Sequence, residues 1–174
     1  MSIEKAILNK LNRTKRGTIF FTQDFVGDYT QVTIRKVFQR LVEKGKIKRI
    51  ANGIYVRPVI SKLIGEITPT AEDVAKAIAQ RDKATIIPSG AMALNLLGLS
   101  TQVPLNIVYL TDGSPRSIKV GKRIIKFKKA APKKLSSKGT LSGMAILALQ
   151  SLGKANLDDE RKQQLIGLLK KEKK

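Results

Sequence analysis

Side chains that can hydrogen-bond to nucleic acid are concentrated between residues 30 and 57. Lysine and arginine bind phosphate oxygens, whereas arginine, glutamine and asparagine can also pair with base edges in a major groove. The residues expected to contact bases are Gln31, Thr33, Arg35, Lys36 and Gln39. Those expected to contact the DNA backbone are Thr30, Arg40, Lys46, Lys48, Arg49, Asn52 and Arg57. These residue types in this order predict a surface that binds nucleic acid.

A helix must hold most of these side chains on one side. Apolar residues recur at intervals of three and four between residues 30 and 44, which predicts an amphipathic helix with a buried stripe. That stripe consists of Ile34, Val37, Phe38, Leu41 and Val42. A glycine at position 45 is a typical helix stop. The polar residues are therefore expected on the solvent side of the helix.

A basic β-hairpin is expected to follow this helix. Residues 46–50 and 54–57 are β-prone, and Asn52-Gly53 between them is the strongest short-range signal for a hairpin turn. Upstream, residues 3–11 show a helical apolar pattern, residues 18–21 are β-prone, and Thr22 can cap a brief helix. This order predicts a winged helix-turn-helix over residues 1–60, with the hairpin as its wing.

Each of these features also has an ordinary structural explanation. A helix with one apolar and one charged face is usually a solvated surface helix, and an Asn-Gly hairpin alone implies nothing about DNA. The functional prediction therefore depends on the order of short helix, turn, amphipathic helix, glycine stop and basic hairpin within residues 22–58.

The second half of the chain alternates between helical and β-prone segments. Residues 60–69 predict a connector with a short helical piece, and helices are expected over residues 71–80, 90–97 and 141–152. Strands are expected over residues 84–87 and 105–110, the latter in the centre of a sheet, with a second hairpin over 117–120 and 123–128. A last helix should begin at Asn156 or Asp158 and reach residue 171. Its acidic start and lysine-rich end complement the helix dipole.

The expected fold class is α+β. A winged helix-turn-helix domain over residues 1–60 is followed, over residues 61–174, by a small mixed α/β domain with a basic β-hairpin and two C-terminal helices. An alternative remains open, in which residues 70–174 pack with the first domain as one unit.

The second hairpin is strongly basic. Between residues 116 and 138 there are ten basic residues and no acidic one. The candidates for a partner surface or a second nucleic-acid surface are Arg116, Lys119, Lys122, Arg123, Lys126, Lys128 and Lys129, and the run continues with Lys133, Lys134 and Lys138. Such a run can also merely protect a sheet edge and keep a protein soluble. The lack of interleaved aromatic residues argues against a base-stacking, single-strand mode.

The overall charge is +21, from 34 basic and 13 acidic residues. A field of this sign concentrates polyanions at the surface, and nucleic acid is the commonest of them. Ribosomal RNA, an acidic protein and an anionic membrane surface are alternatives. The hydrophobic share of 42% is enough to bury a core, so the chain is expected to fold despite its charge.

The chain contains no histidine and no cysteine. Catalytic triads that depend on these residues, thiolate metal sites and disulfides are therefore excluded. The sequence has no phosphate-binding GxxxxGK[ST] loop and no GxGxxG motif, and its acids are scattered. We therefore expect a non-enzyme without metal or cofactor. No signal peptide or membrane-spanning run is evident, so a cytoplasmic protein without membrane contact is expected.

Two regions of the sequence resemble the AbiEi-type antitoxins of bacterial type IV toxin–antitoxin systems and related regulators. The first is residues 41–49 with residues 52–55, and the second is residues 87–99, in which Ala91, Leu94, Gly98 and Leu99 carry the likeness. A strand over residues 107–110 and the basic hairpin follow in the same order. The resemblance implies an autorepressor that binds double-stranded DNA, with an inverted-repeat operator expected, and that counteracts a nucleotidyltransferase-like toxin. A stand-alone module for structured RNA or non-specific DNA is the alternative.

Overall fold

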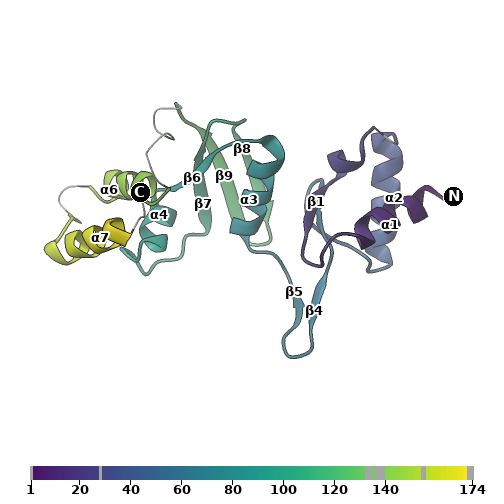
Figure 1. Ribbon diagram of the computed structural model, residues 1–174, viewed down its shortest axis with the longest axis horizontal. Helices are drawn as coiled ribbons and strands as arrows, with labels where there is room; N and C mark the ends of the chain where they lie inside the picture. The colour runs from purple at the N-terminus through teal and green to yellow at the C-terminus, as the bar shows by residue number, and fades with distance from the viewer. Residues whose placement is uncertain (1, 28, 132–134, 136–139, 154–155, 172–174) are drawn as a thin grey trace. The chain divides into compact units, whose positions relative to one another are not determined.

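The computed structural model describes residues 2–27, 29–131, 135, 140–153 and 156–171, and it divides into two compact units (Figure 1). The first unit covers residues 1–77 and the second covers residues 78–174. The fold is α+β, as the sequence predicts. The boundary lies later than the expected one at residue 60, because the segment that follows the first three-stranded sheet belongs to the first unit.

The first unit opens with two α-helices, a short strand and a 3-10 helix. Helix α1 (Ile3–Asn12) precedes strand β1 (Ile19–Phe21), the 3-10 helix η1 (Thr22–Phe25) and helix α2 (Gln31–Glu43). Strands β2 (Lys48–Ala51) and β3 (Ile54–Val56) then form the expected hairpin. The antiparallel sheet has the order β1-β3-β2, with a register irregularity in β2 between Arg49 and Ala51.

An aromatic cluster packs α2 against η1 and the sheet. The ring of Phe38 is fully buried and lies 4.8 Å from the Tyr55 ring, 5.3 Å from the Phe25 ring and 5.7 Å from the Phe20 ring, measured between centroids. Edge-to-face contacts of this kind add to the burial of apolar area. The core of this unit contains Ile7, Leu11, Phe20, Phe25, Ile34, Val37, Phe38, Leu41, Ile47 and Tyr55.

The segment over residues 60–69 was expected to contain a short helical piece, and this expectation is wrong. Strands β4 (Val59–Ser61) and β5 (Gly65–Ile67) form a second antiparallel hairpin there. Gly65 supplies a positive φ of 75° at the turn, which few other residues adopt without strain. The flanking β-branched residues favour strands over a helix.

The second unit contains a mixed four-stranded sheet. Helix α3 (Ala71–Asp82) spans the boundary and is followed by strand β6 (Ile86–Ser89), helix α4 (Ala91–Leu96) and strand β7 (Asn106–Thr111). Strands β8 (Arg116–Val120) and β9 (Arg123–Lys129) form the predicted basic hairpin. The strand order is β6-β7-β9-β8, with β7 parallel to β9, so β7 lies between two strands as predicted.

Two C-terminal helices complete the second unit, on the side where Figure 1 shows α4. Helix α6 (Thr140–Leu152) and helix α7 (Asp159–Lys171) pack with α4 around a core of Ala93, Leu97, Leu99, Ala145, Ala148 and Leu165. The Asp158 carboxylate accepts a hydrogen bond from the backbone N–H of Arg161 at 2.8 Å, which caps α7 at one of the two predicted starts. No helix in the described parts of the chain is long and apolar enough to cross a bilayer.

Candidate nucleic-acid interface

Helix α2 begins and ends where the sequence predicts. Thr30 is its N-cap, and the Thr30 hydroxyl accepts a hydrogen bond from the Thr33 backbone N–H at 3.3 Å. This bond satisfies one of the N–H groups that the first turn leaves without a helical partner. At the other end, Gly45 has a φ of 65°, as a glycine that terminates a helix commonly does. Because both ends are fixed, the polar side of α2 has a defined orientation.

One flank of α2 and the turn of the β2–β3 hairpin line an open groove of about 770 Å³. Arg35 and Gln39 contribute from the helix, and Arg49 and Asn52 contribute from the hairpin. The four side chains were expected to contact DNA, and all four residues are exposed. The structure therefore brings together donors from two separate elements around one concave surface.

The hairpin side of this groove is fixed by local hydrogen bonds. Arg49 donates through Nη2 to the Asn52 side-chain oxygen at 2.9 Å and through Nε to the Ala51 carbonyl at 3.4 Å. The backbone N–H of Thr22 donates to the Gly53 carbonyl at 3.2 Å, which ties the turn to η1. The Arg49 guanidinium is consequently held at the rim of the groove while its other N–H groups remain able to donate.

The opposite flank of α2 presents a different set of side chains. Thr33, Lys36 and Arg40 line a separate shallow concavity of about 270 Å³ together with the first residues of α1. Residues four apart share a helix flank, so Arg35 aligns with Gln39 and Lys36 aligns with Arg40. Gln31 is exposed in the first turn. The expected base-contacting residues therefore divide between two flanks of one helix.

Besides Val42 and Gly53, three groove residues with polar side chains were not among the sequence candidates. Thr22, Glu43 and Tyr55 also line it. Glu43 accepts a hydrogen bond from the Gln39 side-chain nitrogen at 3.2 Å, and the i, i+4 spacing of the two residues is the signal that could have found it. Its carboxylate places one negative charge in a groove otherwise lined by neutral and basic side chains.

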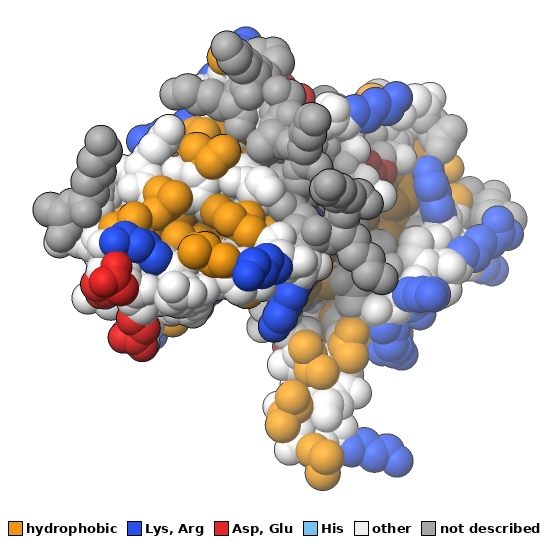
Figure 2. All heavy atoms as spheres, turned by 60° about the vertical axis from the view of Figure 1, so that its left-hand side comes forward, with side chains coloured by type: hydrophobic (Ala, Val, Ile, Leu, Met, Phe, Trp, Pro, Cys, Tyr) orange, Lys and Arg blue, Asp and Glu red, His pale blue; other side chains and the backbone are white. Residues whose placement is uncertain are grey.

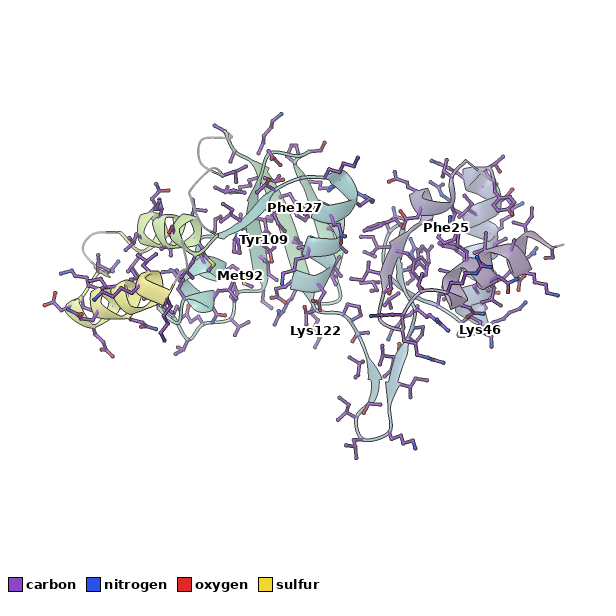
Figure 3. All side chains as sticks on the ribbon, in the orientation of Figure 1. Phe25, Lys46, Met92, Tyr109, Lys122 and Phe127 are labelled. Carbon is purple, nitrogen blue, oxygen red and sulfur yellow. The ribbon has the colours of Figure 1, made fainter. Side chains whose placement is uncertain are left out.

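Two of the basic residues expected at the DNA backbone have partners on elements away from the groove. Lys48 forms an ion pair with Glu66 of β5, with 3.1 Å between Nζ and Oε2. Arg57 is half-buried and donates through Nη1 to the carbonyls of Asn12 at 3.0 Å and Thr14 at 2.5 Å. Arg57 thus satisfies carbonyls at the end of α1 and does not face the groove. Lys46, labelled in Figure 3, is exposed at the start of the hairpin segment.

The basic residues of the β8–β9 hairpin divide between the two faces of the sheet. The register pairs Lys126 with Ser117 and Val108, Lys119 with Ile124, and Lys128 with Leu110, so these lysines share one face. The opposite face contains the stacked rings of Tyr109 and Phe127, whose centroids are 5.9 Å apart (Figure 3). Arg116, Arg123 and Lys129 alternate onto that second face.

Lys122 lies in the turn that joins β8 to β9 and is exposed (Figure 3). The remaining candidates of the basic run, Lys133, Lys134 and Lys138, lie outside the described residues.

The Arg116 side chain makes contacts within the second unit. Its guanidinium forms an ion pair with Asp82 at the end of α3 and lies 5.6 Å from the centre of the Phe127 ring. Burial lowers the pKa of Arg116, and the positive charge of Arg81 lowers it further. Arg116 therefore joins α3 to β8, and its charge is committed to that contact.

Within the described residues, no three acidic side chains gather into a group that could hold a metal ion. The arrangement of the first unit is instead suited to hydrogen bonding and to contact with anions, through side chains of α2 and the β2–β3 turn.

No curated protein matches this chain. A family model matches residues 6–174 and is described as a family of unknown function, DUF6088. Because the match covers nearly the whole sequence, the chain belongs to the DUF6088 family of unknown function.

Proposed function

We propose that residues 1–60 form a winged helix-turn-helix that binds double-stranded DNA, and that the protein is a sequence-specific transcriptional regulator. The element order α1, β1, η1, α2, β2, β3 supports this proposal, as does the antiparallel sheet that joins β1 to the hairpin. In such a domain α2 enters the major groove and the β2–β3 hairpin contacts the neighbouring backbone.

The observation that carries the proposal is the shared groove of α2 and the hairpin turn. Arg35 and Gln39 can each make two hydrogen bonds to a base edge, guanine for arginine and adenine for glutamine. Arg49 and Asn52 lie across the groove from them, where a phosphate oxygen would accept their N–H groups. An amphipathic helix that is merely solvated gives no reason for hydrogen-bond donors on a second element to line the same groove.

The two flanks of α2 suggest separate roles. Arg35 and Gln39 on the hairpin side are assigned to bases, and Gln31 in the first turn lies near them in sequence. Lys36 and Arg40 on the α1 side are assigned to phosphates. Among the remaining backbone candidates, Thr30, Lys46 and Lys48 stay in the proposal.

Binding of the full-length protein to labelled duplexes tests this function. The first duplex should carry the DNA upstream of the protein's own coding sequence, and the second should carry a shuffled version of it. The third should be an RNA duplex with the upstream sequence. The proposal expects tighter binding to the upstream DNA than to the other two. Preference for duplex RNA would favour the RNA-binding alternative, and equal affinity for all three would contradict a sequence-specific regulator.

Substitutions in the groove test the assigned roles. Arg35→Ala and Gln39→Ala should each lower the preference for the upstream DNA by about 1–3 kcal/mol if the lost contact is bidentate. Arg13→Ala and Gln150→Ala are matched controls, because both residues are exposed and lie outside the groove. Equal losses on specific and shuffled DNA for both groove variants would refute base contacts.

An antitoxin role is the second part of the proposal. The lysine face of the β8–β9 hairpin supports it, because Lys119, Lys126 and Lys128 give the second unit a basic surface of its own. A nucleotidyltransferase-like gene beside the coding sequence would provide the toxin for co-expression. Lys126→Gln with Lys128→Gln should then reduce protection from the toxin and leave DNA affinity unchanged, whereas Lys129→Gln on the other face should change neither.

The same variants can contradict the partner assignment. If Lys126→Gln with Lys128→Gln abolishes DNA binding, the lysine face belongs to the DNA interface. If protection persists in full, the partner surface lies elsewhere.

A further inference from the structure

The C-terminal helices expose an apolar surface that no described element covers. Ile146 on α6 is 51% exposed, and Ile166 and Leu169 on α7 are 45% and 38% exposed. Figure 2 brings this end of the second unit forward and shows hydrophobic side chains gathered into a patch, with acidic and basic side chains at its edge. Contiguous exposed patches of this kind mark interaction sites in soluble proteins.

The inner side of α7 is already occupied, so the patch is a separate surface. Leu165 is buried in the core with Leu97 and Ala148, and Gln164 donates a hydrogen bond to the Leu97 carbonyl at 3.2 Å. Ile166 projects beside this core-facing stripe, and Leu169, four residues after Leu165, lies on the flank of the stripe, so each side chain keeps part of its apolar surface exposed. They are therefore available to a partner without rearrangement of the fold.

The charges along α7 indicate what that partner is. Asp159 and Glu160 lie in the first turn, and Lys170 and Lys171 lie in the last turn. Arg161 and Lys162 form ion pairs with Asp158 and Asp159, so residues 158–162 keep a net charge of −1. Two copies of α7 packed antiparallel would bring the acidic start of each helix close to the basic end of the other. A parallel arrangement would instead oppose like charges at both ends. The charge pattern is thus complementary to itself under a two-fold rotation.

The low net charge of the α6–α7 surface also favours contact with a second copy of this strongly basic chain. Helix α6 has no charged residue, and residues 158–171 contain three acidic and four basic residues, which gives a net charge of +1. The whole chain has a net charge of +21. Two copies therefore approach through this face with far less local repulsion than through the basic surfaces described above.

We propose that the α6–α7 face is a homodimer interface, in which α7 packs antiparallel against α7 of a second copy around Ile166 and Leu169. The inference is independent of the proposed function, because it concerns self-association and would hold whatever the protein binds. For a regulator of an inverted repeat, it would also supply the symmetry that such a site requires.

Sedimentation of the full-length protein over a range of concentrations tests the interface. The wild type should reach twice the monomer mass, and Ile166→Glu should raise the dimer dissociation constant by about tenfold or more, because an unpaired charge would enter an apolar contact. Leu63→Glu is the matched control, since Leu63 at the tip of the β4–β5 hairpin is 94% exposed and apolar. A monomeric wild type would overturn the proposal, as would dissociation by the Leu63 variant alone.

Charge reversal tests the antiparallel arrangement separately. Asp159→Lys with Glu160→Lys should weaken the dimer, and Lys170→Glu with Lys171→Glu should do the same. Combining all four changes should restore association. The combined variant opposes the helix dipole at both ends, so a gain in association cannot come from a more stable helix. Failure of the combination to recover, with helix content retained by circular dichroism, would refute antiparallel pairing.

Discussion

Two arginines of the same hairpin region should respond in opposite ways to truncation. Arg49 faces the groove, whereas Arg57 donates to carbonyls at the end of α1. Sequence patterns assign both residues to the DNA backbone. Arg49→Ala should weaken DNA binding and change stability little, because its hydrogen bonds to Ala51 and Asn52 are exposed to solvent. Arg57→Ala should instead lower stability and leave the salt dependence of binding unchanged.

The magnitudes follow from the contacts. Loss of one phosphate contact reduces the slope of log K against log salt by about 0.9. Between 50 and 200 mM salt, the affinity of the Arg49 variant should therefore fall about 3.5-fold less than that of the wild type. The charged Arg57 donates through Nη1 to the Asn12 carbonyl at 3.0 Å and to the Thr14 carbonyl at 2.5 Å, and its contact with the Leu11 carbonyl at 3.5 Å is marginal. Their loss from this half-buried site should cost about 2–3 kcal/mol of unfolding free energy.

Salt-dependent anisotropy titrations and urea unfolding followed by circular dichroism measure the two effects. Each variant is the other's control, because both remove one guanidinium from the same part of the chain. A reduced salt slope for Arg57→Ala, combined with unchanged stability, would refute the assignment of these two side chains. So would a destabilised Arg49→Ala with a normal salt slope.

Three further outcomes are expected in the first unit. Glu43→Gln should tighten binding to all DNA sequences, since it removes the carboxylate from the groove, and unchanged affinity in titrations would place the DNA elsewhere. Phe38→Ala should cost about 3–5 kcal/mol of stability in urea unfolding, because a fully buried ring with three aromatic neighbours is lost. DNA affinity should stay level between pH 6 and pH 8, because no histidine is present to titrate; a clear rise on acidification would contradict this.

The local features of the fold were predictable from sequence. Helix α2 was expected over residues 30–44 and occupies Gln31–Glu43, because the apolar spacing, the Thr30 cap and the Gly45 stop all lie within the segment itself. The β8–β9 hairpin and the central position of β7 follow from equally local patterns. Because such patterns lie within the segment itself, the element that they predict does not depend on contacts with the rest of the chain.

Features that depend on distant contacts were not predictable. The spacing of charged residues cannot show that Arg57 reaches α1 or that Arg116 pairs with Asp82, since these partners are remote in sequence. Each strand of the β4–β5 hairpin has only three residues, too few for an alternation pattern to emerge. The division of α2 into two flanks was implicit in the i, i+4 spacing of Arg35 and Gln39. Which element faces each flank could be seen only in the folded structure.

The ion pair between Lys48 and Glu66 has a consequence for the β4–β5 hairpin. In the protein without DNA, the Glu66 carboxylate pairs with the Lys48 ammonium group, with 3.1 Å between Oε2 and Nζ. A carboxylate and a phosphate compete for the same donor, so Glu66 acts as an internal mimic of the anion that the proposed function assigns to Lys48. Exposed pairs of this kind hold with only about 0.2–1 kcal/mol. An incoming polyanion can displace Glu66 at little cost, and that exchange would release β5 from β2.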